Sequence, residues 1–225
     1  MKPWELLGRA STADGREMRL SKRDTEYAIF VDNKLLMSSR MHGSEEALAA
    51  LACATARTTR APRVLVGGLG MGFTLRATLD LLPPGAEVIV AELVPAVIEW
   101  NRGPLAPLAG RPLDDKRVRV EPVDVAVTLG THRGTFDAIL LDVDNGPTAF
   151  TTDSNAGLYG NAGVVLAREA LRPGGILAVW SAWEDRKFEQ RLQYYGFRVS
   201  VSRVRARLKK GGRRHTIFVG VRPEK

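Results

Sequence analysis

The stretch Arg63-Val64-Leu65-Val66-Gly67-Gly68-Leu69-Gly70-Met71-Gly72-Phe73-Thr74-Leu75-Arg76 decides the fold. An apolar run gives way to four glycines within six positions, and apolar residues then return at helical spacing as Leu75, Leu79 and Leu82. This order predicts a buried strand, a tight turn and a helix. Glycine lets the turn approach a ligand closely, and the helix N-terminus directs its N–H groups toward that ligand. The G-x-G-x-G spacing differs from the dinucleotide fingerprint, so the turn alone indicates a nucleotide-like ligand.

Acidic residues at the ends of the next two strands narrow the range of possible ligands. Glu92 ends a buried strand and can bind the two hydroxyls of a ribose, while Asp124 follows the strand 118–120 and can lie beside an adenine amino group. Each acid also fits a simpler role as a helix cap. Because parallel strands end at the edge where ligands bind, we predict a nucleoside site there. Its expected residues are Gly68, Leu69, Gly70, Met71, Gly72, Glu92, Leu93, Asp124, Val125 and Asp142.

Composition limits the class of protein. The chain has 225 residues, with 44% hydrophobic and 26% charged side chains, which suits one α/β domain with a small appendage. No apolar run approaches the ~20 residues that cross a bilayer, and the start of the chain has no signal-peptide pattern. Cys53 is the only cysteine, and the three histidines lack ligand spacing. We therefore expect a cytoplasmic protein without a metal site.

The net charge of +8 is concentrated near the C-terminus. Residues 198–225 contain ten Lys or Arg and one acid, whereas the other 197 residues contain 23 basic and 24 acidic side chains. Arg203, Arg205 and Arg207 alternate with apolar residues and should share one strand face. The segment Arg203–Arg214 then fits either a solvated sheet edge that discourages pairing or a patch for the phosphates of nucleic acid.

The remaining pattern predicts a small β-domain over residues 1–42 and an α/β domain over residues 43–225. A turn is expected at Asp32-Asn33-Lys34, and Ser44 is expected to cap a helix that runs to about Arg57. Further strands are expected at 136–141, 175–180, 198–208 and 215–221, and helices at 155–171 and 184–195. This alternation predicts a parallel sheet of seven strands whose last strand is antiparallel.

The fourth strand of this sheet ends in two more carboxylates, Asp142 and Asp144. At a strand end that faces the glycine turn, such groups can hold an amine or take its proton, and Asp142 is the better placed of the two. The alternative is that Asp144-Asn145-Gly146-Pro147 is a simple turn in which Asp144 accepts backbone N–H groups.

The sequence resembles the spermidine synthase-like family of class I S-adenosylmethionine-dependent transferases. The matching stretches are 64–72, 90–95, 137–142, Leu158-Tyr159 and 171–175. The resemblance implies a Rossmann-like methyltransferase core that binds an adenosyl sulfonium. It also implies that Glu92 holds the ribose, that Asp124 holds the adenine, and that Asp142 is the catalytic aspartate that activates an amine.

The sequence departs from that family at residues that bind the amine of the cofactor and the acceptor. Met71 stands where the family has an aspartate that holds the amine of decarboxylated S-adenosylmethionine, and 43–50 lacks the family's tyrosine. We therefore expect methyl transfer from S-adenosylmethionine to an unknown small-molecule acceptor, with an amine among the candidates. Aminopropyl transfer from decarboxylated S-adenosylmethionine stays open, as do a non-catalytic nucleoside-binding module with a polyanion-binding hairpin and assembly as a homodimer.

Overall fold

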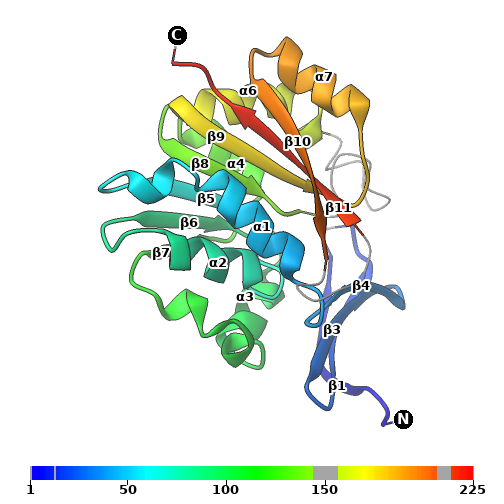
Figure 1. Ribbon diagram of the computed structural model, residues 1–225. Helices are drawn as coiled ribbons and strands as arrows, with labels where there is room; N and C mark the ends of the chain where they lie inside the picture. Colours follow the sequence, from blue (N-terminus) through cyan, green and yellow to red (C-terminus); the bar gives the residue numbers. More distant parts are fainter. Residues whose placement is uncertain (1, 13, 144–156, 207–213, 225) are drawn as a thin grey trace.

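The computed structural model describes residues 2–12, 14–143, 157–206 and 214–224. Its main sheet has seven strands in the order β10-β11-β9-β8-β5-β6-β7 (Figure 1). The strands are β5 (Arg63–Gly67), β6 (Glu87–Ala91), β7 (Val118–Glu121), β8 (Phe136–Leu141), β9 (Leu171–Ser181), β10 (Arg198–Arg205) and β11 (Arg214–Val221). Strands β5 to β9 pair in parallel, and β11 runs antiparallel to both of its neighbours. The predicted fold class, a Rossmann-like methyltransferase core, is confirmed.

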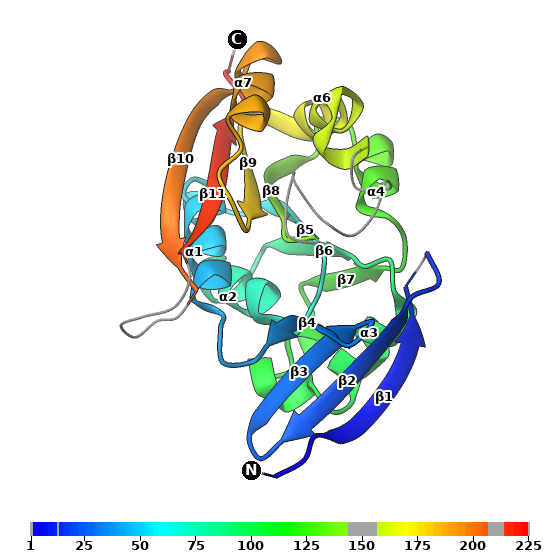
Figure 2. The ribbon, with the colours of Figure 1, turned by 90° about the vertical axis from the view of Figure 1, so that its right-hand side faces the viewer.

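Helices cover both faces of this sheet. One face carries α1 (Gly43–Ala52), α2 (Phe73–Leu81) and α3 (Pro95–Arg102), and the other carries α4 (Val125–Thr131), α6 (Asn161–Ala170) and α7 (Arg186–Tyr194) (Figure 2). Short 3-10 helices lie at η1 (Ala56–Thr58), η2 (Ala106–Ala109) and η3 (Pro112–Asp114). Because successive strand residues face opposite ways, Val64 and Val66 pack with the first helix layer and Leu65 packs with the second.

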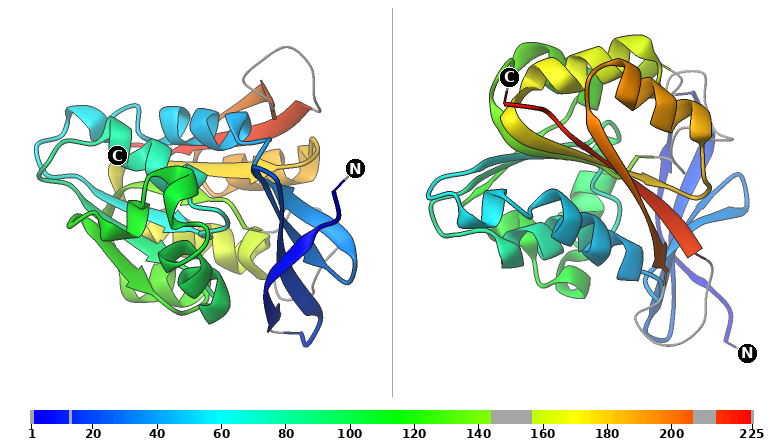
Figure 3. Two further views of the ribbon diagram at one scale, coloured as in Figure 1. Left: turned by 90° about the horizontal axis from the view of Figure 1, so that it is seen from below. Right: turned by 45° about the horizontal axis from the view of Figure 1, so that its top comes forward.

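A separate antiparallel sheet stands across the carboxyl ends of the parallel strands (Figure 3). It consists of β1 (Glu5–Ser11), β2 (Glu17–Arg23), β3 (Glu26–Val31) and β4 (Lys34–Ser38). The turn predicted between the last two strands is confirmed, since Asp32 and Asn33 have φ values of 46° and 65°. Leu20 and Ile29 pack into the same buried core as α1 and α2. The small sheet is therefore held in place as one wall of the space above the main sheet.

Some predicted boundaries were wrong. Helix α1 begins at Gly43 with His42 at the N-cap position and ends at Ala52, so Ser44 is not the cap and the helix does not reach Arg57. The Ser44 hydroxyl bonds to the neighbouring Glu45 carboxylate instead. Strand β9 begins at Leu171, before the predicted start, because Leu171 already pairs with the first residue of β8.

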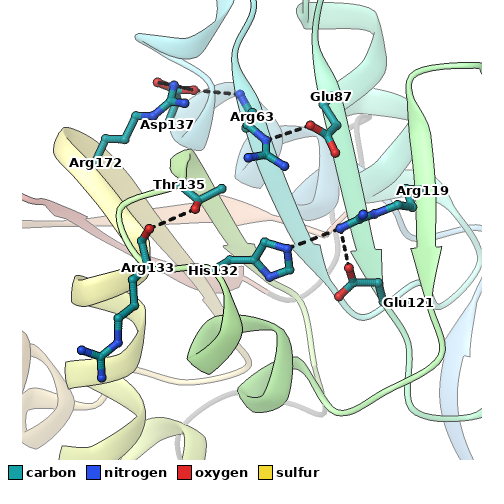
Figure 4. A network of polar contacts seen from close by, with 9 residues as sticks. All are labelled: Arg63, Glu87, Arg119, Glu121, His132, Arg133, Thr135, Asp137 and Arg172. Atoms are coloured by element: carbon teal, nitrogen blue, oxygen red, sulfur yellow. Dashed lines mark hydrogen bonds and ion pairs between the residues drawn. The ribbon is translucent and has the colours of Figure 1, made fainter.

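The amino ends of the parallel strands are joined by ion pairs (Figure 4). The Asp137 carboxylate accepts a hydrogen bond from the Arg63 backbone N–H at 2.7 Å and lies 2.9 Å from the Arg172 guanidinium. The Arg63 side chain lies 2.8 Å from Glu87. These contacts link β5, β6, β8 and β9 at the end opposite the expected site, and they leave the carboxyl ends open for a ligand.

Among the helices of the described segments, none combines the length and the apolar character needed to cross a membrane. The same segments contain no cluster of three His, Cys, Asp or Glu side chains arranged to hold a metal ion.

Candidate active site

A cleft of about 1040 Å³, its open mouth included, lies between the carboxyl ends of the parallel strands and the small sheet. The main domain contributes Gly68, Gly70, Ala91, Glu92, Leu93, Val94, Val97, Asp124, Val125, Asp142 and Val143. The small sheet and its turns contribute Thr12, Asp14, Arg16, Met18, Ile29, Val31, Leu36 and Met37, none of which was predicted from sequence. The cleft therefore brings together seven of the ten predicted cofactor-binding residues.

The glycine turn requires glycine for steric reasons. Gly68 has a φ of 88°, and a Cβ on it would lie 2.5 Å from the carbonyl oxygen of Asp142. The turn thus packs directly against the end of β8, with Gly68 and Gly70 in the cleft wall. The other predicted loop residues, Leu69, Met71 and Gly72, are not in the wall. Leu69 and Met71 are only 3% and 4% exposed and belong to the core under the turn.

Glu92 fixes the turn from the side of β6. Its two carboxylate oxygens accept backbone N–H bonds from Leu69 at 2.9 Å and from Val94 at 2.8 Å, and the residue is 8% exposed. A ribose hydroxyl is a donor that a carboxylate can accept. Glu92 therefore combines the predicted site position with a structural role that sequence analysis did not assign.

Glu92→Ala should weaken the binding of methylthioadenosine by about 10- to 150-fold, because hydrogen bonds to a charged group contribute ~1.5–3 kcal/mol. Glu92→Gln keeps one acceptor oxygen and should lose less. Calorimetry with both variants checks this order. If Glu92→Ala binds the nucleoside as tightly as the unmodified protein, Glu92 holds the turn but not the ribose.

Asp124 caps a helix and also lies in the cleft wall, so its position is compatible with both roles that the sequence left open. It is the N-cap residue of α4, where its Oδ1 accepts a hydrogen bond from the Ala126 N–H at 2.8 Å, and it also lines the cleft. Its neighbour Val125 lines the same wall and packs against Gly67. The second carboxylate oxygen of Asp124 can therefore bind a ligand while Oδ1 caps the helix.

Asp142 follows β8 directly and lines the cleft beside Gly68. Its Oδ2 accepts a hydrogen bond from Thr74 Oγ1 at 2.5 Å, from the first turn of α2. Burial raises the pKa of the Asp142 carboxyl, and the bond from Thr74 partly offsets this. The second predicted catalytic residue, Asp144, lies outside the described residues, as does the turn 144–147.

Glu45 is a functional candidate that sequence analysis missed. It lies in the first turn of α1, and burial together with the charge of Asp142 raises the pKa of its carboxyl to about 8. Two carboxyl groups that repel each other in this way hold one proton between them at neutral pH. The signal in the sequence was the pair Glu45-Glu46 at a helix start, which also suits ordinary interaction with the helix dipole.

The basic hairpin is described only in part. Arg203 and Arg205 are exposed on edge strand β10 while Val204 between them is partly buried, as the alternation predicted. Arg203 forms an ion pair with Glu184, so one of the positive charges of the hairpin is already offset. Arg207, Lys209, Lys210 and Arg213 lie outside the described residues. Binding of nucleic acid or another polyanion here stays a prediction.

No family model matches the sequence. Curated polyamine aminopropyltransferases of Mycobacterium tuberculosis and Mycobacterium bovis are 32% identical to it over 168 residues, which is 73% of this chain and 30% of theirs. The structure of a spermidine synthase from Thermotoga maritima superimposes with a TM-score of 0.76 over 98% of this chain and 74% of that one, at 18% identity. In sequence and in fold, the chain is similar to proteins of the spermidine synthase-like family. A spermidine synthase bound to the transition-state analogue AdoDATO gives a TM-score of 0.75, over 98% of this chain and 73% of that one, at 16% identity.

The chain spans about a third of the length of the curated relatives that it matches. Its resemblance to the solved spermidine synthases extends over the small sheet as well as the core, since 98% of the chain is covered. The small sheet that closes the cleft is therefore part of the shared fold.

Proposed function

We propose that the chain is an S-adenosylmethionine-type transferase that moves an aminopropyl group from decarboxylated S-adenosylmethionine to a small amine. The observation that carries the proposal is the position of Asp142, a carboxylate in the cleft wall next to a glycine turn. Glu92 and Asp124 line the same cleft and suit a nucleoside. The activity named for the curated relatives supports the same chemistry.

The choice of transferred group differs from the expectation drawn from sequence. Methyl transfer was favoured because Met71 replaces an acid expected to hold the cofactor amine. Met71 is buried in the core, so its lack of charge says little about the cleft. The relatives' names support aminopropyl transfer over methyl transfer. Two carboxyl groups that affect each other's ionisation, one of them in the cleft wall, also suit a cationic amine.

In this proposal Asp142 prepares the nucleophile. The acceptor enters as an ammonium ion, and Asp142 takes one proton so that the nitrogen carries a free electron pair. The nitrogen then bonds to the aminopropyl carbon that is attached to sulfur. The bond between that carbon and sulfur breaks, and its electron pair returns to sulfur. The bond from Thr74 fixes the direction of the carboxylate, which keeps the acceptor aligned with the carbon it attacks.

The products decide the reaction. Incubation with decarboxylated S-adenosylmethionine and putrescine should give methylthioadenosine and spermidine, and no methylthioadenosine should form without the amine. Incubation with S-adenosylmethionine and the same amine should give no S-adenosylhomocysteine. If S-adenosylhomocysteine is formed instead, the group transferred is methyl. If nucleosides bind in calorimetry and neither product forms, the chain is a binding module.

A further inference from the structure

We propose that Asn101 is a positioning residue of the nucleoside site. Its side-chain amide holds the Gly70 carbonyl group behind the cleft wall, and this contact keeps the glycine turn in a form that leaves room for the ligand. The inference rests on the proposed function, because that function places the cofactor against this turn. Asn101 lies near the end of α3 and was not among the residues predicted from sequence.

The glycine turn is held by three different parts of the main domain. Gly68 lies against the backbone of Asp142 at the end of β8, and the N–H of the next residue bonds to Glu92 at the end of β6. The third contact comes from α3, where Asn101 Nδ2 donates a hydrogen bond to the Gly70 carbonyl oxygen at 2.8 Å. Because Glu92 and Asp142 both line the cleft, the form of the turn determines the space between these two acids.

The surroundings of Asn101 fix the direction of its amide. The residue is 1% exposed, and Nδ2 also donates to the Val97 carbonyl oxygen at 2.9 Å. Since both neighbouring groups are acceptors, the NH₂ side of the amide has to face them. Oδ1 has no hydrogen-bond partner within the described part of the chain. A buried polar atom without a partner costs stability, so we infer that the amide serves the turn rather than the packing of α3.

The Gly70 carbonyl group depends on this one contact. Within the described segments no other donor bonds to its oxygen, whereas the Val97 oxygen is also the regular acceptor of a backbone N–H in its own helix. Gly70 lines the cleft with a φ of 52°. Without the amide, its carbonyl would be unpaired behind the wall, and the flexible glycine backbone would turn the oxygen toward water in the cleft. An oxygen there takes space that the nucleoside needs.

Binding of methylthioadenosine tests this role. Asn101→Leu should raise the Kd about tenfold, because the released turn has to be ordered again when the ligand binds, while the melting temperature should change little. Thr78→Val is the matched control, since Thr78 is also fully buried and its hydroxyl bonds only within its own helix, to the Thr74 carbonyl oxygen at 2.8 Å. If Asn101→Leu binds as tightly as the unmodified protein, or if Thr78→Val loses as much affinity, the proposal is wrong.

Asn101→Asp tests the hydrogen bond itself. Burial raises the pKa of the introduced carboxyl group, and its protonated form can donate to Gly70 as the amide does. At pH 5 this variant should therefore bind methylthioadenosine more tightly than Asn101→Leu, and the advantage should fall as the group ionises at higher pH. Comparing the two variants at each pH cancels the titration of Glu92, Asp124 and Asp142, which both retain. Equal affinities of the two variants at pH 5 would overturn the role of the bond.

Hydrogen exchange tests the contact without a ligand. The backbone N–H groups of Leu69 and Gly72 bond to the Glu92 carboxylate at 2.9 Å and to the Leu69 carbonyl oxygen at 2.8 Å. Both should exchange faster in Asn101→Leu than in the unmodified protein, and Thr78→Val should leave them unchanged. Unchanged exchange in Asn101→Leu contradicts the proposal. If the unmodified protein binds no methylthioadenosine, the proposed function is wrong instead, and the exchange rates still decide whether Asn101 holds the turn.

Discussion

Asp142→Asn should lower the rate of transfer by about 10²–10⁴-fold, the range that a general base contributes. Asparagine keeps the shape of the side chain and can still accept the hydrogen bond from Thr74 Oγ1, but it cannot take a proton from the amine. The affinity for methylthioadenosine should stay near that of the unmodified protein, because the proposed function assigns the nucleoside to Glu92 and Asp124, which line the same cleft. Single-turnover kinetics with saturating amine and calorimetry with the nucleoside measure the two quantities separately.

The same substitution should stabilise the fold at alkaline pH. The pKa values of Asp142 and Glu45 are raised in the folded protein, that of Glu45 to about 8. Ionising both groups therefore costs folding stability as the pH rises from the ordinary pKa of a glutamate, 4.5, to about 8. Asp142→Asn removes the cost of ionising a buried carboxyl group and also its charge beside Glu45, so it should gain about 1–3 kcal/mol at pH 8, since one pKa unit corresponds to about 1.4 kcal/mol. The gain should vanish near pH 4, where both groups are protonated.

Urea denaturation at pH 4 and pH 8 checks this dependence, with Thr74→Val as the comparison. Thr74→Val removes the bond that lowers the Asp142 pKa but leaves both carboxyl groups, so it should not stabilise the protein at pH 8. An Asp142→Asn protein that is both fully active and no more stable at pH 8 would contradict the general-base role and the repulsion between the acids.

The sequence predicted the sheet well because its strands are marked locally. Strand β8 has the predicted bounds Phe136–Leu141, since an apolar run between polar residues leaves little choice of register. The start of α1 was predicted less well. Ser44 is a strong capping type, but its hydroxyl bonds to the neighbouring Glu45 and contacts the distant His215. The helix therefore begins at Gly43, two residues before the start that a Ser44 cap would give. Local preference for a cap was outweighed by contacts between distant segments.

The difference between local signals and contacts of distant segments also explains which residues of the candidate site could be predicted. Residues that follow a strand, such as Glu92 and Asp142, could be predicted because parallel strands end at one edge. The proximity of Glu45 to Asp142 could not, because it depends on how α1 packs against α2 and β8. For Met71 the sequence predicted a site residue that the structure places in the core. Its place in the glycine motif suggested a ligand contact, whereas the left-handed turn at Gly70 and Gly72 directs its side chain into the core.

Met71→Asp should therefore destabilise the protein by about 3–5 kcal/mol at pH 7 rather than convert its cofactor preference. A carboxylate at this position would be enclosed by apolar side chains, and a buried charge without a partner costs several kcal/mol. Because burial raises the pKa of such a group, the loss should be smaller at pH 5, where more of it is protonated. Urea denaturation at both pH values measures this loss.

Met71→Leu is the matched control, since it keeps an apolar side chain of similar volume and should cost less than about 1.5 kcal/mol. If Met71 instead held the place of the family's aspartate in the cleft, Met71→Asp would shift the preference towards decarboxylated S-adenosylmethionine by about tenfold, or ~1.4 kcal/mol. Calorimetry with both sulfonium compounds separates the two cases. A Met71→Asp protein that is as stable as the Met71→Leu protein and shows the tenfold preference would mean that this side chain reaches the cleft. With Met71 in the core, discrimination between the two compounds has to come from charges that line the cleft, and Asp142, with Glu45 behind it, disfavours the additional carboxylate of full S-adenosylmethionine.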